Sequence, residues 1–302
     1  MLALVQNIAI IFSLEENIIS MMLKKYTFDS KIAGPKVLFL GAIHGNEPAG
    51  AQAIFKVVEK FASHAISPLK GIVEFIPVCN PLAFEKNVRQ IDENLNRVIK
   101  DWDAPTNYEQ QLGKEIASYI KNSDIIIDLH SSHCPQDKPF IFSDYPDKTA
   151  DKLCLAQTIQ YIVKGWPEIY SSSPIADFST GNCAHYYNKT CLTIECGWHQ
   201  SPQSEQVAYY AIMNTLLSLQ MLEGFPAQSI EQTLIMMDCF IIKQFSGKLA
   251  QSYRHLDKVS KGEILASYDN GKSIICPQDG FIMLPNADAA INTEWFYLGH
   301  SL

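Results

Sequence analysis

The sequence predicts an α/β fold, with a mainly parallel or mixed sheet flanked by helices and, after it, a small all-β domain. Three features lead to this expectation. Short apolar segments rich in β-branched residues alternate with segments of helical periodicity, the alternation stops near residue 225, and only short strand-like runs separated by turns follow. Strands that alternate with helices of roughly 10–15 residues are typical of parallel sheets with right-handed crossover connections.

Four of the apolar segments have the composition and length of strands that are buried on both faces. They span residues 37–43, 72–78, 124–129 and 191–196. Helical periodicity is expected between these strands and after the last of them. The predicted helices span residues 48–62, 108–121, 151–163 and 205–222.

The chain is expected to form two domains, because single hydrophobic cores stop growing beyond roughly 250 residues. The break falls at residues 224–229 (GFPAQS), and turn sequences such as DNGK and PQDG recur after it. We expect a catalytic domain over residues 21–225 and a β domain over residues 229–302. Residues 1–20 are a candidate N-terminal extension, since two consecutive methionines and a strand-like run follow them.

Composition and charge argue against several classes of partner. The formal net charge is -8, with 24 Lys+Arg against 32 Asp+Glu, and no basic run is present that would follow a nucleic-acid backbone. No segment reaches the roughly 18 apolar residues that a membrane helix requires. The eight cysteines form no CxxC pair, and no basic residue precedes the apolar N-terminal run. We therefore expect a cytoplasmic enzyme with neither nucleic-acid nor membrane partners.

Metal-ligating side chains follow two of the predicted strands at the point where each strand ends. His44 and Glu47 lie in the HGNE sequence after the first strand, and His130 directly follows the third. Open α/β sheets place ligands at the carboxyl ends of their strands, so we expect these three side chains to meet. Two histidines and one glutamate with an open fourth position are typical of catalytic zinc, and we expect one Zn²⁺ per chain. Cobalt, manganese or iron also suits this ligand set.

The third ligand has a competitor three residues further along the chain. His133 stands in HSSH, but it falls in a predicted loop, whereas His130 joins the strand directly, so we favour His130. Asp128 precedes His130 by two residues and lies on the same side of an extended strand. Asp128 is therefore a candidate to orient the His130 imidazole; the alternative is a carboxylate that closes the turn at the strand end.

Two further features indicate hydrolytic chemistry. Glu195 ends the fourth strand, where a carboxylate is costly to bury unless it is paired or bound to a metal, so we expect a general base for an attacking water. Residues 88–97 (VRQIDENLNR) carry two arginines and little periodicity, as an active-site loop does. One arginine is a candidate to neutralise an oxyanion and another to hold a substrate carboxylate. The alternative is a solvated loop with internal Asp–Arg pairs.

Four ordered motifs between about residues 36 and 200 resemble the succinylglutamate desuccinylase and aspartoacylase family, which is similar in fold to zinc carboxypeptidases. The motifs are GAIHGNEPAG, then NP followed by RxIDxxLNR, then IDLH, then IECG. The resemblance implies that His44, Glu47 and His130 hold zinc and that Glu195 is the catalytic carboxylate. It also implies that Arg89 polarises the scissile carbonyl, and that Asn96 and Arg97 bind the carboxylate of the substrate.

The sequence departs from the resemblance at two places. In aspartoacylases an arginine about ten residues before the catalytic glutamate binds a second substrate carboxylate, but His185 stands at that offset here. Either His185 or Lys189 substitutes, or the substrate lacks that carboxylate. The family also places a tyrosine from its second domain in the site. Tyr297 is available for this role, although we favour a packed strand tyrosine.

The resemblance implies hydrolysis of the amide bond of a small anionic N-acyl amino acid, with metal-activated water and Glu195 as general base. The alternative hydrolase is a zinc carboxypeptidase or a murein-peptide amidase that acts on short peptides. A third hypothesis is a non-catalytic module in which the metal is structural or absent and the β domain binds a partner. The oligomeric state stays open, with a homo-oligomer among the candidates.

Overall fold

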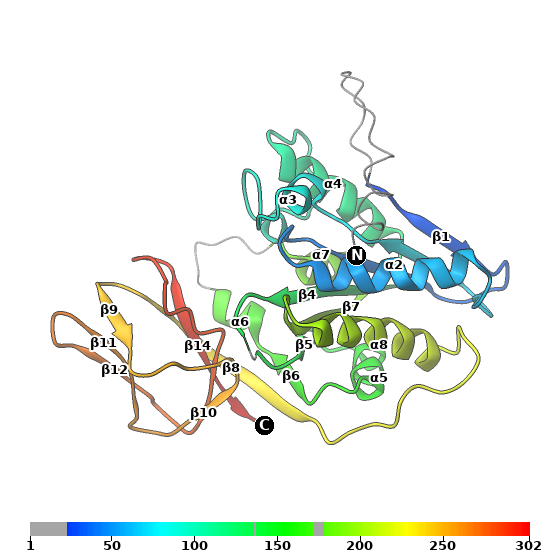
Figure 1. The fold of residues 1–302 in the computed structure, drawn as a ribbon. Helices are drawn as coiled ribbons and strands as arrows, with labels where there is room; N and C mark the ends of the chain where they lie inside the picture. Colours follow the sequence, from blue (N-terminus) through cyan, green and yellow to red (C-terminus); the bar gives the residue numbers. More distant parts are fainter. Residues whose placement is uncertain (1–22, 136, 172–177) are drawn as a thin grey trace.

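The computed structural model describes residues 23–135, 137–171 and 178–302. The candidate N-terminal extension, residues 1–20, lies outside this range. Within the described residues an eleven-stranded mixed sheet runs through the molecule, in the order β1-β3-β2-β4-β7-β5-β6-β8-β14-β13-β10. Helices cover the first part of this sheet, and the C-terminal strands extend to one side of the helical layers (Figure 1).

The centre of the sheet is parallel, as the sequence predicts, because strands β3, β2, β4 and β7 pair in parallel. Their bounds are Lys36–Gly41 for β2, Ile72–Ile76 for β3, Ile125–Ser132 for β4 and Thr190–Trp198 for β7. Antiparallel strands flank this centre: β1 (Tyr26–Asp29) pairs with β3, and β5 (Phe140–Phe142) pairs with β7. The sheet is therefore mixed around a parallel core.

Both faces of the parallel core are covered, which explains why its strands are apolar throughout. On β2, Val37 and Phe39 pack against one group of helices, whereas Leu38 and Leu40 pack against the other. The first group is α2 (Pro48–Ala62), α5 (Lys148–Ala156) and α8 (Pro202–Ser218). The second group contains α4 (Tyr108–Lys121) and α7 (Thr180–Tyr186), and the short helices α3 (Pro81–Glu85), η1 (Leu95–Arg97) and α6 (Trp166–Tyr170) lie in connections.

The helix predicted over residues 151–163 is wrong at its C-terminal end. Helix α5 ends at Ala156, because Gln157 adopts an extended conformation with ψ 147°. Strand β6 (Tyr161–Lys164) follows and pairs in parallel with β5. Residues 159–163 (IQYIV) are mostly apolar, with three β-branched residues, and a run of this length has no periodicity that separates a strand from the end of a helix.

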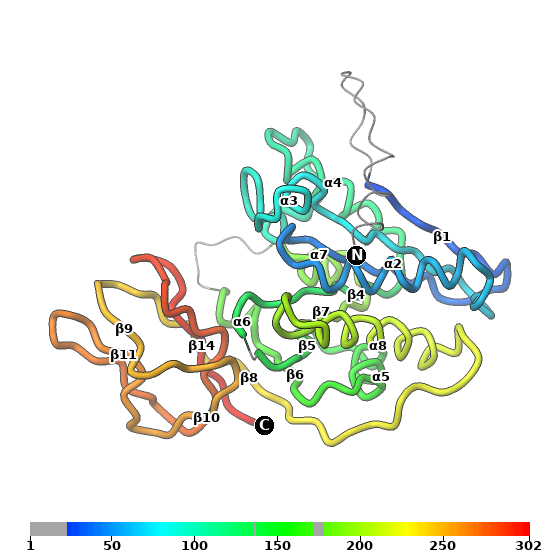
Figure 2. Tube along the Cα trace, in the orientation of Figure 1, coloured from blue at the N-terminus to red at the C-terminus, as the bar shows by residue number. Residues whose placement is uncertain are grey.

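The C-terminal region is all β, as predicted, and it continues the main sheet. Strand β8 (Thr233–Ile242) pairs in parallel with β6, and the strands β14 (Glu294–Ser301), β13 (Gly280–Met283) and β10 (Asp257–Val259) follow in antiparallel order. A separate three-stranded sheet contains β9 (Gly247–Leu249), β11 (Ile264–Tyr268) and β12 (Ser273–Ile275). The trace in Figure 2 shows this region beside the helical layers. Among the described residues, no helix combines the length and the hydropathy needed to cross a bilayer.

His255 connects the C-terminal strands to the sheet beside the predicted site. Its ring is 1% exposed and packs on Phe140 of β5, with 4.3 Å between ring centroids. The backbone N–H of Leu284 donates a hydrogen bond of 3.0 Å to Nδ1 of His255. Burial lowers the pKa of His255 to about 3, so the folded protein holds a neutral imidazole at this contact.

The free energy of unfolding should therefore depend on pH through His255. The unfolded imidazole binds a proton below its ordinary pKa of 6.5, whereas the folded one stays neutral to about pH 3. Stability that is present above pH 6.5 is thus lost as the pH falls. His255→Asn, whose amide oxygen can accept the Leu284 N–H, should remove about 2 kcal/mol of the loss between pH 7 and pH 4.5. Urea unfolding measures this, with the exposed His64→Asn as control, and equal pH slopes would contradict it.

Candidate active site

The turn after β2 is tightly constrained, and it directs two side chains inward. Ala42 has a left-handed backbone with φ 46°, which is uncommon for a residue with a side chain and is found at functional sites. A Cβ at Gly45 would lie 2.1 Å from the carbonyl carbon of Ala83, so only glycine fits there. Helix α2 begins directly after Glu47. His44 and Glu47 are thereby buried, at 4% and 5% exposure.

The structure brings His44 and Glu47 together with His130, which β4 supplies from the neighbouring strand. One candidate ligand atom from each residue lies within 4.8 Å of the others, and all three residues are buried. Nδ1 of His44 is 2.8 Å from Oε1 of Glu47, and Nδ1 of His130 is 3.0 Å from Oε2 of Glu47. His133 is exposed and does not take part in this cluster.

The Nε2 atoms of the two imidazoles, which point away from Glu47, each lie within hydrogen-bond distance of a side-chain oxygen. Nε2 of His130 is 2.9 Å from Oδ2 of Asp128, so of the two alternatives for Asp128 the contact with the imidazole is present. Nε2 of His44 is 3.0 Å from Oδ1 of Asn94, and the same oxygen accepts the backbone N–H of Asn96 at 2.9 Å. Each imidazole therefore uses Nε2 as a donor and turns Nδ1 toward Glu47, as histidine metal ligands commonly do.

This arrangement gathers groups that can bind a cation between them. Burial lowers the pKa of His44 to about 4, so with Nε2–H directed at Asn94 the lone pair on Nδ1 faces the Glu47 carboxylate. Burial alone would raise the pKa of Glu47, but the two imidazoles bring that pKa well below its usual value. Burial also acts against a charged His130, yet Asp128 and Glu47 raise the pKa of His130. The donor set fits a divalent metal ion, which would replace the protons that these acceptors otherwise share.

Asn94 was not among the predicted site residues, although it lies within the predicted loop. Its contact with His44 joins positions 50 apart in the sequence, and no periodic pattern reports such a pair. A signal was available in its place within RQIDENLNR, since polar residues in a loop beside predicted metal ligands are candidates to orient them.

Glu109 is a second residue that sequence reasoning missed, and it organises the predicted active-site loop. Its carboxylate is fully buried in the first turn of α4. It accepts the backbone N–H groups of Ile91 at 2.7 Å, Asp92 at 3.0 Å and Glu93 at 3.3 Å. The side-chain amide of Asn80 donates a fourth bond of 3.2 Å. From the sequence alone, a glutamate at this position only indicates a helix N-terminus.

Replacing Glu109 with glutamine should loosen the loop of residues 88–97. The NH₂ group of the glutamine would take the place of one carboxylate oxygen, so some backbone N–H groups of the loop would lose their acceptor. Hydrogen bonds to a buried charged group contribute roughly 1.5–3 kcal/mol each, so we expect kcat/KM to fall about tenfold to a hundredfold. The melting temperature should also fall, while bound metal stays unchanged. Glu115→Gln on the same helix is the matched control, since Glu115 accepts from Leu23 and Tyr119 instead. Equal activity of the two variants would contradict this positioning role.

The three remaining loop residues of the prediction lie around the cluster. Nη1 of Arg89 donates to Oε1 of Glu47 at 2.9 Å, and the Arg89 side chain is 49% exposed. Oδ1 of Asn96 accepts the backbone N–H of Thr180 at 2.9 Å, which leaves its amide NH₂ as a donor. Arg97 donates to the Asn96 carbonyl at 2.8 Å, and its guanidinium lies 5.5 Å from the ring centroid of Trp166.

Glu195 lies beside the cluster at the carboxyl end of β7. It is in register with His130 of β4 on one side and with Phe140 of β5 on the other. Burial raises the pKa of Glu195 to about 7, and the nearby His130 charge opposes that rise. A carboxyl group with this pKa can both accept and return a proton near neutral pH.

The structure places Lys189 far from Glu195 and stacks the His185 ring on another aromatic ring. Lys189 directly precedes β7. The first residue of this strand, Thr190, donates its backbone N–H to the carbonyl of Asp124, just before β4. At about 3.3 Å per residue, the start of β7 is roughly 16 Å from Glu195. His185 lies in the last turn of α7, where its ring stacks on Tyr145 with 3.9 Å between centroids.

Tyr297 of β14 is a buried residue with an engaged hydroxyl. It is 7% exposed, and its hydroxyl lies 2.6 Å from that of Tyr170. This contact agrees with the packed reading of Tyr297.

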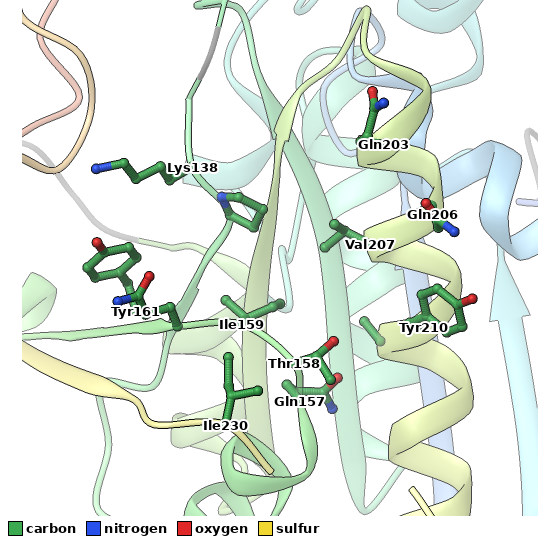
Figure 3. Close-up of a pocket in the computed structure, with 13 residues that line it drawn as sticks. Lys138, Gln157, Thr158, Ile159, Tyr161, Gln203, Gln206, Val207, Tyr210 and Ile230 are labelled. Atoms are coloured by element: carbon green, nitrogen blue, oxygen red, sulfur yellow. The ribbon is translucent and has the colours of Figure 1, made fainter. Parts of the chain in front are cut away.

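A separate surface groove of about 570 Å³ runs along α8 (Figure 3). Its lining includes Lys138, Tyr161, Gln206 and Tyr210, and none of the residues predicted to be catalytic or metal-binding contributes to it. The groove is therefore separate from the cluster at the strand ends.

Comparison with known proteins gives consistent matches over most of the chain. Residues 33–219 match the family described as succinylglutamate desuccinylase/aspartoacylase catalytic domain. The succinylglutamate desuccinylase of Vibrio cholerae serotype O1 (strain ATCC 39541) is 23% identical over 263 residues, which cover 82% of this chain and 75% of that protein. The succinylglutamate desuccinylase of Shewanella denitrificans is 24% identical over 293 residues, with coverage of 89% and 81%.

Solved structures share the fold. A succinylglutamate desuccinylase/aspartoacylase from Rhodobacter sphaeroides matches with a TM-score of 0.73 at 17% identity, and the match covers 90% of this chain and 87% of that one. The product-bound ectoine utilization protein EutE (DoeB) from Ruegeria pomeroyi matches with a TM-score of 0.72 at 19% identity, with coverage of 89% and 86%. Identities this low establish the architecture alone.

Proposed function

This chain belongs to the succinylglutamate desuccinylase/aspartoacylase family, and from that membership together with the geometry of the site we propose that it is a zinc-dependent deacylase of N-acyl amino acids. The observation that carries the proposal is the buried cluster of His44, Glu47 and His130 beside Glu195. The proposal retains the cytoplasmic location and the small anionic substrate expected from the sequence.

The cluster provides three candidate ligands, the number that catalytic zinc sites commonly take from the protein. A zinc ion held by His44, Glu47 and His130 would supply a Lewis acid that polarises the amide carbonyl and makes a water molecule more acidic. Asp128 and Asn94 fix the orientation of the two imidazoles.

Glu195 moves the protons of the reaction. Its carboxylate takes one proton from the attacking water as the new C–O bond forms on the carbonyl carbon. The same group then delivers that proton to the amide nitrogen, and the C–N bond breaks. The products are the carboxylate of the acyl group and the free amino acid, whose ammonium group takes up the second proton of the water. A pKa raised by burial to about 7 suits both roles near neutral pH.

The arginines bind negative charge at two places. Arg89 contacts Glu47 of the proposed metal site, and its side chain is partly exposed. Its guanidinium can therefore approach the carbonyl oxygen of the scissile amide, where negative charge develops during the attack. Arg97, together with the free amide NH₂ of Asn96, provides donors for the carboxylate of the amino acid. Glu109 keeps these residues in place by holding the backbone between them.

The proposal is tested by amine release from the zinc-loaded protein. N-acetyl and N-succinyl amino acids should be hydrolysed, and short peptides with free amino termini should react at least about a hundredfold more slowly in kcat/KM. Faster cleavage of the peptides would support the carboxypeptidase or murein-peptide amidase reading. No cleavage of any compound by protein that carries zinc would contradict the proposal.

A further inference from the structure

We infer that the preferred substrate carries an aromatic side chain on its amino acid, beside the carboxylate that Arg97 binds. This inference rests on the proposed deacylase function and names the substrate class of the same site. Two independent features lead to it: the cations that would bind a second carboxylate are directed elsewhere, and a wall of aromatic rings stands next to Arg97.

The arginines of the chain are few, and each has a defined position. The sequence contains three, Arg89, Arg97 and Arg254. Arg89 contacts Glu47 in the cluster, and Arg97 is the donor for the substrate α-carboxylate in the proposed function. Nε of Arg254 lies 3.8 Å from Oδ1 of Asp257, in the C-terminal region.

The nearby lysines do not replace a second arginine. Lys100, three residues after Arg97, places its ammonium 3.9 Å from the ring centroid of Trp102 and 4.2 Å from that of Phe178. Lys189 lies at the opposite end of β7, as described above. Neither Lys100 nor Lys189 therefore offers a cation that would offset the loss of hydration of an acidic side chain on the substrate.

The wall beside Arg97 consists of aromatic rings from separate elements. Trp166, the first residue of α6, lies under the Arg97 guanidinium at 5.5 Å and is only partly buried. Its ring packs against Tyr297 at 5.4 Å, Tyr170 at 4.9 Å and Phe142 at 5.4 Å between centroids. A ligand whose carboxylate pairs with Arg97 thus meets the exposed part of this indole.

The wall lies on the face of the sheet that also carries the catalytic glutamate. Phe142 is in register with Thr193, two residues before Glu195, and Phe140 is in register with Glu195 itself. Side chains two apart on a strand point to the same face. The aromatic residues and Glu195 therefore border one region, as a side chain next to the scissile amide requires.

The polar groups within the wall are two hydrogen-bonded hydroxyls and one carboxylate. The hydroxyls of Tyr170 and Tyr297 lie 2.6 Å apart, and Tyr170 also donates to Glu294 at 3.3 Å. The Glu294 carboxylate places negative charge behind these hydroxyls, whereas a flat ring against Trp166 gains stacking and burial. The wall thus favours an aromatic group over a second carboxylate, which gains neither stacking nor a partner within the wall.

The experiment compares kcat/KM of the zinc-loaded enzyme on N-acetyl derivatives of L-phenylalanine, L-alanine and L-aspartate, and on N-succinyl-L-glutamate. We expect N-acetyl-L-phenylalanine to exceed both acidic substrates by at least about tenfold. Trp166→Leu retains an apolar side chain without the flat ring. It should lower kcat/KM for the phenylalanine substrate about five- to tenfold and for the alanine substrate by less than about twofold. Tyr210→Ala, in the groove along α8, is the aromatic control.

Preference for N-acetyl-L-aspartate or N-succinyl-L-glutamate would overturn the inference and leave the deacylase function standing. An equal effect of Trp166→Leu on the phenylalanine and alanine substrates would have the same meaning. Calorimetric binding to the Glu195→Gln protein provides a readout without turnover. If no amide is cleaved, the proposed function fails. Binding of N-acetyl-L-phenylalanine that is at least about tenfold tighter than that of N-acetyl-L-aspartate would then still support the aromatic site, and weaker or equal binding would reject it.

Discussion

Replacing Glu195 with glutamine is expected to lower kcat about a thousandfold while the protein keeps its metal. General acid–base catalysis contributes roughly a hundredfold to ten-thousandfold to such reactions, and Glu195 performs both proton transfers in the proposed function. Glutamine has nearly the same shape and fits between His130 and Phe140, but it neither accepts nor returns a proton. The three metal ligands are untouched by the change.

The measurement combines steady-state kinetics with elemental analysis on the same samples. In wild type, activity should decline at low pH as Glu195 becomes protonated, and this acid limb should be absent from the residual activity of Glu195→Gln. Glu205→Gln is the matched control, since Glu205 lies on α8 and pairs with Lys56. A Glu195→Gln enzyme with wild-type kcat would contradict the role of Glu195 as general base.

The central strands and two of the long helices could be predicted from the sequence, because their apolar residues repeat with a clear period. The predicted bounds 48–62 and 108–121 match α2 and α4. Helices α3 and α6 have five residues each, and strands β1 and β6 have four. Elements this short do not show a period, and α5 and β6 were accordingly merged into one helix.

The position of the site could also be predicted, because topology alone brings the ends of neighbouring parallel strands together. His44, Glu47, His130 and Glu195 all follow or end such strands, and the structure places them side by side. Their roles and the metal itself stay predictions. The orienting contacts of Asn94 and Glu109 could not be predicted, since they depend on how a loop of irregular backbone folds back onto distant residues.

The continuity of the sheet across the predicted domain break also could not be predicted from local sequence patterns. Strand β8 follows the predicted domain break, yet it pairs with β6 about 70 residues earlier, at Tyr161 and Thr233. This pairing brings β14 and its Tyr297 next to Trp166. A hydrophobic pattern reports which residues are buried but not which distant strand covers them. The aromatic wall therefore became visible only in three dimensions.

Replacing His44 with alanine should abolish metal binding and, with it, at least a thousandfold of the activity. The change removes one of three ligand atoms and leaves Glu47 and His130, which together bind a divalent ion far more weakly. His133→Ala is the matched control, because His133 has the same residue type three positions from a ligand but is exposed and outside the cluster. It should retain about one zinc per chain, as should wild type.

Thermal unfolding with and without zinc gives a readout of His44→Ala that does not depend on turnover. A ligand that binds only the folded state stabilises it by about 4 kcal/mol at a thousand times its dissociation constant, so zinc should raise the Tm of wild type and of His133→Ala. His44→Ala should show almost no such rise, because its remaining ligands leave the ion mostly hydrated. If His44→Ala instead keeps its zinc and its Tm increase while His133→Ala loses both, the metal is held through the exposed histidine, and the cluster described above is not the metal site.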